Sequence, residues 1–272
     1  MSDTSLAQDY RKADWALVTG ASDGIGQALA VEAAKAGYNV ILTGRRTDRL
    51  EAHAESLRRA YFVATVCITA DLSDPDAAEA LWVESLKSGR IAVLVNAAGL
   101  GRNGAFLDPE GWLRESESIL VNVISATILM KRALAHMTAN GGGRILNVAS
   151  AAGFMPGPNM AVYAATKAYL LSLSEAVAEE AAKGAVFVTA LCPGATTTGF
   201  FAADTADRAT LLTRFLPMAT PQAVAATGWA GLENGRRVVV TGWLNKALAF
   251  APRLLPRRVT VWITGQVLRR RW

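Results

Sequence analysis

Short apolar runs alternate with longer amphipathic segments along most of the chain. Runs of about four to eight residues rich in β-branched or aromatic side chains are typical of buried strands, whereas longer segments with helical periodicity are typical of helices. The pattern predicts strands at residues 15–18, 39–43, 61–68, 92–96, 144–148, 186–191 and 237–241. It predicts helices at residues 25–36, 49–60, 75–86, within 112–137, 162–182 and 221–233. This alternation favours a parallel sheet with helices on both faces.

Residues 194–220 depart from this pattern. They carry apolar side chains between turn-forming residues, which is typical of a lid over a binding site. Two interpretations stay open for these side chains: they close over a lipophilic substrate, or they cover the cofactor and the core whatever the substrate is. The residues are Phe200, Phe201, Leu211, Leu212 and Phe215. No internal repeat or low-complexity linker interrupts the chain, so we expect one α/β domain over residues 13–242 and a tail over residues 243–272.

Composition narrows the class of protein. Of the 272 residues, 51% are hydrophobic and 19% are charged, which excludes general disorder. The two cysteines and two histidines lie far apart in sequence, which argues against a disulfide framework or a zinc cluster of known spacing. The first residues are polar and lack an apolar core, so we expect no targeting signal and a reducing, cytoplasmic location.

A glycine-rich turn follows the first predicted strand directly and leads into a helix. The turn reads Thr19-Gly20-Ala21-Ser22-Asp23-Gly24-Ile25-Gly26. Glycines at these positions permit a tight turn, a close approach of backbone N–H groups to a pyrophosphate and close helix–strand packing, while the helix N-terminus attracts anions. We therefore expect a dinucleotide to contact Gly20, Ser22, Asp23, Gly24, Ile25 and Gly26.

The end of the second predicted strand carries the signal for cofactor choice. An enzyme that favours NAD would place a carboxylate there for the ribose 2′-hydroxyl, but the sequence reads Gly44-Arg45-Arg46. Guanidinium groups at this point favour a 2′-phosphate, so we predict NADP(H) in preference to NAD(H). The alternative is that Arg45 and Arg46 are solvated residues at a helix start.

Two further segments lie where the adenosine half of a dinucleotide would rest. Asp71, followed by Leu72, comes after the third strand, where its carboxylate would accept a hydrogen bond from the adenine amino group. Asn96, Ala97, Ala98 and Gly99 follow the fourth strand, and their small side chains would let backbone lie against the adenosine. The plain alternative for Asp71 is a turn-forming residue before a helix cap.

A candidate catalytic group lies in the second half of the chain. Tyr163 and Lys167 are four residues apart and share one face of a predicted helix. Ser150 ends the preceding strand, at the sheet edge where ligands of α/β proteins bind, and Asn122 lies inside the long fourth helix.

These four side chains suit hydride transfer between a nicotinamide and a carbonyl carbon. A free phenol, with a pKa of about 10, is a poor base near neutrality. We expect the Lys167 ammonium and an oxidised nicotinamide together to lower the pKa of Tyr163 by about three units, and Tyr163 to serve as acid in reduction and base in oxidation. Ser150 would hydrogen-bond the substrate oxygen, and Asn122 would hold a water that links Lys167 to solvent.

With these residues in view, the chain resembles the short-chain dehydrogenase/reductases. Thr19–Gly26 matches the family's T-G-x-x-x-G-x-G, Asn96–Gly99 its N-N-A-G and Tyr163–Lys167 its Y-x-x-x-K, with Ser150 thirteen residues upstream. Asn122 matches the helix asparagine of the family's tetrad. Pro193–Thr198 is similar to its P-G-x-x-x-T element, which implies cofactor contacts for Pro193, Gly194 and Thr198.

The resemblance implies a single seven-stranded parallel Rossmann sheet, NAD(P) use, a Ser–Tyr–Lys–Asn site in which Tyr163 and Lys167 also contact the cofactor, and a homo-oligomer, either dimer or tetramer. Two departures stand out: Ala97 replaces the usual second asparagine, and Asp23 places a negative charge near the phosphates. The expected activity is interconversion of an alcohol and a carbonyl compound, with a small-molecule substrate. The alternatives are a catalytically silent NADPH-binding sensor or scaffold, and epimerisation or dehydration through transient hydride transfer.

The tail is basic. Nine Lys and Arg and no acidic residue follow residue 235. The net charge of the whole chain is +5, so residues 1–235 have a net charge of 5 − 9 = −4. Apolar residues recur at helical spacing from Leu244, with a kink expected at Pro252 and an end at Pro256. Residues 244–272 would lie on an anionic membrane surface, or would dock on a second subunit or on the lid. Nucleic acid is not expected as a partner, because no recognition motif accompanies the charge.

Overall fold

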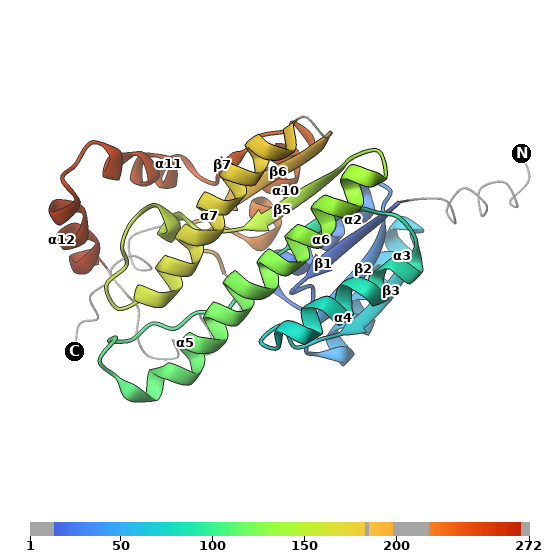
Figure 1. The fold of residues 1–272 in the computed structure, drawn as a ribbon, viewed down its shortest axis with the longest axis horizontal. Helices are drawn as coiled ribbons and strands as arrows, with labels where there is room; N and C mark the ends of the chain where they lie inside the picture. The colour runs from blue at the N-terminus through green and yellow to red at the C-terminus, as the bar shows by residue number, and fades with distance from the viewer. Residues whose placement is uncertain (1–13, 183–184, 198–217, 268–272) are drawn as a thin grey trace, which may run out of the picture.

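The computed structural model describes residues 14–182, 185–197 and 218–267. Seven strands in this part of the chain form one sheet in which every adjacent pair is parallel (Figure 1). Their order is β3-β2-β1-β4-β5-β6-β7, so the chain winds outward from β1 in both directions. The strands are β1 (Trp15–Thr19), β2 (Asn39–Gly44), β3 (Thr65–Thr69), β4 (Ile91–Asn96), β5 (Gly143–Val148), β6 (Val186–Cys192) and β7 (Val238–Val240). The predicted fold class is confirmed.

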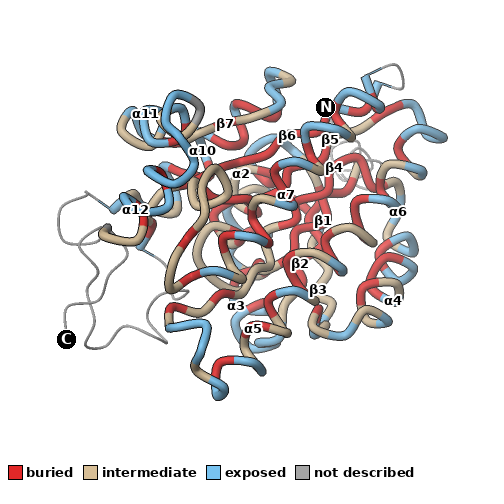
Figure 2. Tube along the Cα trace, turned by 60° about the vertical axis from the view of Figure 1, so that its left-hand side comes forward, coloured by how far each residue is buried: buried red, intermediate tan, exposed pale blue. Residues whose placement is uncertain are grey.

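Helices cover both faces of this sheet, and each face has its own apolar core. The helices α2 (Gly24–Lys35), α3 (Thr47–Tyr61) and α10 (Pro221–Glu233) pack on one face. The helices α4 (Pro75–Ser85), α6 (Ala126–Ala139) and α7 (Ala161–Ala181) pack on the other. Alternate residues of a strand serve opposite cores, as Val18 and Leu17 do in β1, because successive side chains of a strand point to opposite faces. Buried residues accordingly follow the strands through the middle of the molecule (Figure 2).

The predicted strand at residues 61–68 is wrong at its start. Tyr61 ends α3, Phe62 adopts a left-handed conformation with φ of 57°, and β3 begins only at Thr65. The buried stripe of α3, which includes Leu50, Ala54 and Leu57, continues to Tyr61 at helical spacing. The strand was predicted to start too early because tyrosine is common in strands, whereas Tyr61 here continues the apolar stripe of the helix.

One long helical segment runs from Pro109 to Ala139. It comprises a 3-10 turn (Pro109–Gly111), α5 (Trp112–Ile119), the π-helical turn η3 (Leu120–Ser125) and α6. This segment is the one helix in the described ranges that is long and apolar enough to cross a bilayer, by length and composition alone. In the structure α6 instead turns its apolar residues into the core beneath the sheet; among them are Leu129, Met130, Ala133 and Met137.

The tail differs from its predicted single, kinked helix. Helix α11 (Trp243–Phe250) ends before Pro252, a 3-10 turn follows (Ala251–Arg253), and a second helix, α12 (Arg257–Val267), begins directly after Pro256. Pro256 therefore starts a helix rather than ending one: its carbonyl accepts from Val259 N at 2.9 Å. A proline suits this place because the first N–H groups of a helix have no partner within the helix.

Candidate functional site

The predicted site residues converge on one edge of the sheet. Strand β1 pairs with β2 on one side and with β4 on the other, so the direction of winding reverses between β1 and β4. In open parallel sheets, ligands bind at such a switch point beyond the carboxyl ends of the strands. The segments that follow β1, β4, β5 and β6 all leave the sheet at this edge and carry the predicted site residues.

The glycine turn after β1 has no room for side chains. Gly20 and Gly24 have φ of 67° and 57°, values that favour glycine. A Cβ on Gly20 would lie 2.8 Å from Ala98 N, and one on Gly26 would lie 2.3 Å from the Gly20 carbonyl oxygen. The turn thus packs closely against the start of α2 and the loop after β4, and its residues 22–25 are partly exposed at the N-terminus of α2, where the helix dipole favours an anion.

The hydroxyl of Thr19 ties the two loops together, a role that the sequence analysis missed. Thr19 Oγ1 donates to the Val95 carbonyl at 3.3 Å and accepts from Ala97 N at 3.0 Å and Ala98 N at 2.9 Å. These bonds hold the loop after β4 against the glycine turn. The threonine stood in the recognised motif, but only the pairing of β1 with β4 brings its hydroxyl to Ala97 and Ala98.

Asn96 faces inward rather than toward the site. Its side chain is buried, and Nδ2 donates to Asn147 Oδ1 at 2.9 Å and to the Ala126 carbonyl at 3.2 Å. The residue thereby braces β4 against β5 and α6. Gly99 does line the site, because a Cβ on it would lie 3.2 Å from Lys167 Nζ and 3.4 Å from Asn122 Oδ1.

The arginines after β2 point in different directions. Arg46 turns back to the glycine turn, where Nη2 donates to Ser22 Oγ and Asp23 Oδ2, both at 3.2 Å. Arg49 Nη1 donates to the same Asp23 oxygen at 3.3 Å. The negative charge that Asp23 brings to the turn is therefore offset by two guanidinium groups. Arg49 was missed, although it lies three residues after Arg46 in the first turn of α3, a spacing that places both on one face.

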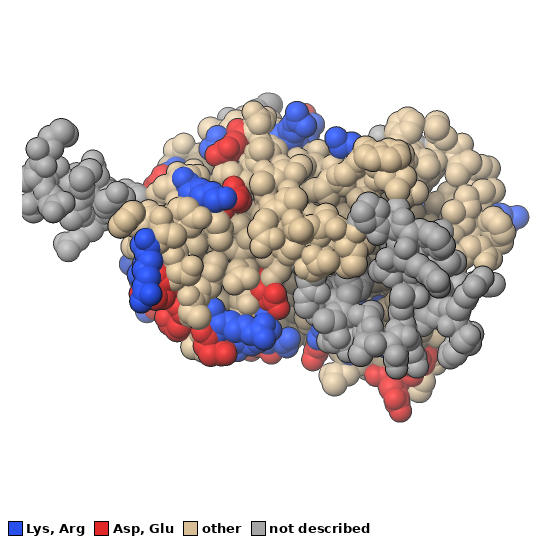
Figure 3. Space-filling model, turned by 180° about the vertical axis from the view of Figure 1, so that it is seen from behind, with Lys and Arg blue, Asp and Glu red and all other residues tan. Residues whose placement is uncertain are grey.

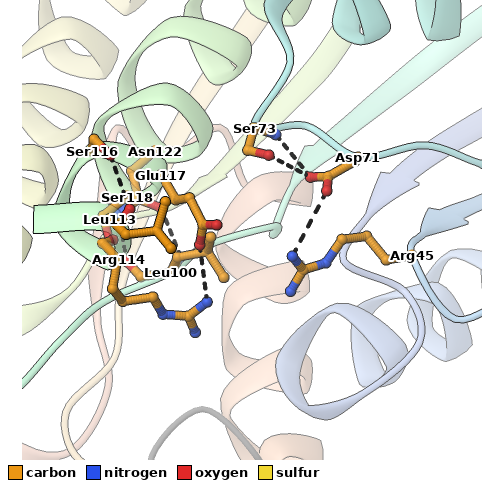
Figure 4. A network of polar contacts seen from close by, with 10 residues as sticks. All are labelled: Arg45, Asp71, Ser73, Leu100, Leu113, Arg114, Ser116, Glu117, Ser118 and Asn122. Carbon is orange, nitrogen blue, oxygen red and sulfur yellow. Dashed lines mark hydrogen bonds and ion pairs between the residues drawn. The ribbon is translucent and has the colours of Figure 1, made fainter. Parts of the chain in front are cut away.

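Arg45 lies beside the adenosine end of the predicted site. Its Nη1 is 3.8 Å from Asp71 Oδ2 (Figure 4). The other carboxylate oxygen of Asp71 accepts from Ser73 N at 3.0 Å and Ser73 Oγ at 2.8 Å. The Ser73 backbone N–H, chiefly, holds the pKa of Asp71 below its usual range. Leu72 is buried, and its carbonyl accepts from Ser125 Oγ at 2.7 Å.

The loop after β6 meets both the catalytic strand and the tail. The Pro193 carbonyl accepts from Ala151 N at 2.9 Å, which joins this loop to the residue after Ser150. Gly194 packs against α11 so closely that a Cβ on it would lie 2.2 Å from Asn245 Nδ2. Thr198 and most of the predicted lid lie outside the described residues, including Phe200, Phe201, Leu211, Leu212 and Phe215.

Ser150, Tyr163 and Lys167 form one cluster, in which Ser150 and Lys167 are buried and Tyr163 is partly exposed. Ser150 lies at the end of the strand–loop junction after β5, and Tyr163 and Lys167 lie on α7. The Tyr163 phenol shares a hydrogen bond with the Ser150 side chain. Lys167 Nζ lies 5.8 Å from the centre of the Tyr163 ring and donates to the Val148 carbonyl at 2.8 Å. The predicted triad is thus brought together beside Gly99.

The pKa values of this cluster are set mainly by burial. Lys167 is only 3% exposed, and burial lowers its pKa to about 8. The structure differs from the expectation of a lowered pKa for Tyr163: burial raises the pKa of the phenol, and the Ser150 hydrogen bond opposes that rise. The physical reason is that burial disfavours both charged forms, the ammonium and the phenolate.

Asn122 holds the loop after β4 instead of pointing freely to solvent. Its Oδ1 accepts from Leu100 N at 2.9 Å, and its Nδ2 donates to the Leu100 carbonyl at 2.8 Å (Figure 4) and to Thr166 Oγ1 at 2.9 Å. The residue sits in the π-helical turn η3, a local widening that is frequent at functional sites. The role of Asn122 in holding a water stays a prediction. Asn122 Oδ1 and Lys167 Nζ lie near each other, because both are within 3.4 Å of the position that a Cβ on Gly99 would take.

Cys192 lies at the end of β6, directly beneath this cluster. It is fully buried, and burial raises the pKa of its thiol to about 12. The thiol therefore stays protonated near neutrality and is a poor nucleophile. Within the described residues, no group of three or more His, Cys, Asp or Glu is placed to hold a metal ion.

Comparison with known proteins identifies a family and several relatives of similar sequence. The model of the short chain dehydrogenase family matches residues 14–209. Hydroxysteroid dehydrogenase-like protein 1 of Gallus gallus is 39% identical over 184 residues, which are 66% of this chain and 54% of that protein. Human 17-beta-hydroxysteroid dehydrogenase type 3 is 35% identical over 188 residues, 68% of this chain and 59% of that protein. A further human relative, 33% identical over 71% of this chain and 58% of its own length, is named inactive hydroxysteroid dehydrogenase-like protein 1.

The chain therefore spans a little over half the length of these relatives. Among solved structures, a short-chain dehydrogenase of Sphingobium yanoikuyae in complex with NADPH has a TM-score of 0.77 and 29% identity, over 88% of this chain and 93% of that one. The glycine turn, the clustered serine, tyrosine and lysine, and the match over most of the sheet agree in one assignment: this chain belongs to the short-chain dehydrogenase/reductase family.

Proposed function

We propose that this chain is an NADP(H)-dependent oxidoreductase that interconverts a carbonyl compound and an alcohol. The observation that carries the proposal is the cluster of Ser150, Tyr163 and Lys167 beside a glycine turn shaped for a dinucleotide. The pKa of Lys167 is lowered and that of Tyr163 is raised, because the environment of each group disfavours its charged form. Such shifts concentrate at functional sites.

The residues of the cluster can divide the reaction among them. Bound NADPH would supply the hydride to the carbonyl carbon. Tyr163 would donate its proton to the carbonyl oxygen, which completes the alcohol, and Ser150 would donate a hydrogen bond to the same oxygen. In the reverse direction Tyr163 would accept the proton. Lys167, whose ammonium lies over the phenol ring, would stabilise the phenolate left after proton donation and would hold the nicotinamide ribose.

The residues after β2 support NADP(H) over NAD(H). No carboxylate ends β2, and Arg45, Arg46 and Arg49 surround the exposed region beyond Gly44. Arg46 and Asp23 are each about two-fifths exposed, and an ion pair in such a setting contributes little. A phosphate dianion at this point would therefore draw the guanidinium groups to itself at small cost. The NADPH complex of the Sphingobium relative is in line with this preference.

We propose a lipophilic carbonyl compound as the substrate. The support comes from relatives whose names refer to steroids, including human 17-beta-hydroxysteroid dehydrogenase type 3. Another relative, the very-long-chain 3-oxoacyl-CoA reductase of Coprinopsis cinerea, is named for a fatty acyl substrate. Both substrate classes are apolar, and residues 194–220 were predicted from sequence to form an apolar lid.

A catalytically silent NADPH-binding protein is the second candidate. It is favoured by the human relative named inactive. The cluster of Ser150, Tyr163, Lys167 and Asn122 argues for the enzyme, since a binding protein does not need a proton donor next to the nicotinamide. The homo-oligomer and the cytoplasmic location stay predictions. Helices α5, α6 and α7 adjoin one another and carry exposed apolar residues, among them Leu113 and Tyr169, which offer one surface for a second copy.

The first prediction concerns Tyr163. Replacing Tyr163→Phe removes the proton donor and should lower kcat/KM by about 100- to 10,000-fold, the usual contribution of a general acid. The affinity for NADPH, measured by the change in its fluorescence, should stay within about twofold of the wild type, since the ring itself is kept. A panel of lipophilic ketones assayed by NADPH absorbance provides the rates.

Tyr169→Phe is the matched control on the same helix. Its hydroxyl lies on the surface, 3.0 Å from Thr127 Oγ1, so its loss should leave the rates unchanged. Retention of turnover in Tyr163→Phe would disprove the assigned role. Tight NADPH binding without turnover of any ketone in the wild type would favour the silent protein.

The second prediction concerns cofactor choice. Replacing Arg45→Ala and Arg46→Ala together should lower kcat/KM for NADPH at least about tenfold, because hydrogen bonds to charged groups contribute about 1.5–3 kcal/mol each. The value for NADH should change far less. Arg59→Ala, at the opposite end of α3, is the control and should alter neither. A wild type that prefers NADH, or equal losses for both cofactors, would argue against the assignment.

The third prediction uses the low pKa of Lys167. Its folded-state pKa of about 8 lies below the ordinary lysine pKa of 10.5, so the folded state binds fewer protons than the unfolded state between these pH values. The free energy of unfolding should therefore rise from pH 8 to pH 10.5, relative to Lys167→Met, by about 3 kcal/mol in total. Denaturant unfolding of both proteins without cofactor measures the difference. Parallel pH curves would show that Lys167 titrates normally.

A further inference from the structure

We propose that α11, the turn after it and α12 form a docking surface for an anionic lipid bilayer. We call residues 243–267 the C-terminal arm. Its apolar side chains face outward, its charge is positive, and it adjoins the loop that follows Ser150. The docking itself does not depend on the oxidoreductase activity; its consequence for substrate supply rests on the proposed function.

Helix α12 has its hydroxyl side chains toward the protein and its apolar side chains outward, the reverse of a helix on the surface of a soluble domain. Its inward side is formed by Thr260 and Thr264, which are 6% and 7% exposed, and the Thr260 hydroxyl is buried without a hydrogen-bond partner in the described residues. Its outward side chains are apolar and exposed; they are Val259, Val261, Trp262 and Ile263. A helix that packs on a soluble domain normally buries its apolar stripe. Small and hydroxyl residues against protein, with apolar residues outward, are typical of helices in contact with lipid.

The rest of the arm continues this apolar surface. Trp243 is 80% exposed and Phe250 54%, and Leu254 and Leu255 are exposed as well, while Ala249 alone of α11 is buried. Of 21 exposed large hydrophobic residues in the described part of the chain, nine lie between residues 243 and 263. This concentration exceeds the scattered exposure expected of a surface without a partner.

The charge of the arm favours lipid over a second copy. Lys246, Arg257 and Arg258 are exposed, and the sequence contains no acidic residue after Glu233. A symmetric dimer through this face would set the same positive charges against one another. An anionic bilayer offers phosphate and carboxylate groups to the basic residues and an apolar layer to the tryptophans. In Figure 3 most of the charged side chains in view lie at the end of the molecule opposite the arm.

The lengths of the helices indicate how the arm would bind. Helix α12 has 11 residues and α11 has eight, so neither reaches across a hydrocarbon core of about 30 Å at 1.5 Å per residue. Such helices lie in the plane of the interface with their apolar side chains inserted. Trp243 and Trp262 would sit at the level of the headgroups, where tryptophan is enriched.

The arm packs against the rim of the candidate active site. Thr264 Oγ1 donates to the Pro156 carbonyl at 2.9 Å, and a Cβ on Gly265 would lie 3.5 Å from Pro158. Both prolines belong to the loop between Ser150 and Tyr163. Docking would therefore bring this loop to the bilayer surface, and a lipophilic carbonyl compound dissolved in the membrane could reach the site without crossing water.

Vesicle sedimentation of the full-length protein tests the proposal. Phosphatidylcholine vesicles with and without phosphatidylserine serve as probes. The wild type should sediment with the anionic vesicles and much less with the neutral ones. Phe250→Ser and Trp262→Ser should each weaken this partition about tenfold, because each removes an aromatic side chain from the interface. Arg257→Gln and Arg258→Gln together should weaken it about 25-fold, since each basic residue near such a surface contributes about fivefold.

Matched substitutions at the far end of the molecule are the controls. Phe62, 70% exposed after α3, matches Phe250, and the adjacent pair Arg58 and Arg59 matches Arg257 and Arg258. Phe62→Ser and the double change Arg58→Gln with Arg59→Gln should bind vesicles as the wild type does. Cooperative thermal unfolding of the arm variants shows that they are folded, and the exposed arginine pair provides a second test if an aromatic variant unfolds.

Three results would overturn the proposal. One is a wild type that stays in solution with anionic vesicles. Another is equal partition of arm and far-end variants. The third is a dimer, detected by light scattering, that dissociates in the Phe250→Ser variant while vesicle binding stays unchanged. That result would identify a second copy of the chain as the partner of the arm. Because sedimentation needs no turnover, its failure leaves the oxidoreductase proposal intact, and an inactive protein that binds vesicles leaves the docking proposal intact.

Discussion

The burial of a lysine ammonium against a phenol is the constraint on which the rest of the site depends. Lys167 Nζ donates to the Val148 carbonyl and lies over the Tyr163 ring in a place almost without water. A charge is costly in such a place unless polar partners surround it. The sheet supplies one such partner, the carbonyl of Val148 at the end of β5. Gly99, after β4, leaves room for the ammonium because it has no side chain.

The parallel sheet explains why groups so distant in sequence meet here. Strands β1, β4, β5 and β6 all have their carboxyl ends at one edge of the sheet, and the loops and helices that follow them carry the site residues. Thr19 fastens the loop after β4 to the glycine turn, and Asn122 fastens the next part of that loop to the π-helical turn. The nucleotide half and the catalytic half of the site are thus held by hydrogen bonds from one shared loop.

Sequence patterns sufficed where chemistry and spacing are local. The alternation of apolar runs predicted the seven strands, and the motifs predicted the turn at Gly20 to Gly26 and the cluster around Tyr163. They failed where a contact depends on tertiary packing. They did not predict that the Asn96 side chain braces Asn147, that Arg49 joins Asp23 across 26 residues, or that burial raises the pKa of Tyr163. The orientation of α12 likewise depends on tertiary packing, because the hydrogen bond from Thr264 to Pro156 decides which side of the helix faces the protein.

Transfer of deuterium is the most direct measurement of the central claim. The protein would be incubated with lipophilic ketones and NADPH that carries deuterium at the transferable position of C4, and the alcohol would be analysed by mass spectrometry and NMR. The account predicts one deuterium at the new carbinol carbon and a slower rate than with unlabelled NADPH. Protein that binds NADPH but yields no deuterated alcohol from any ketone would contradict it.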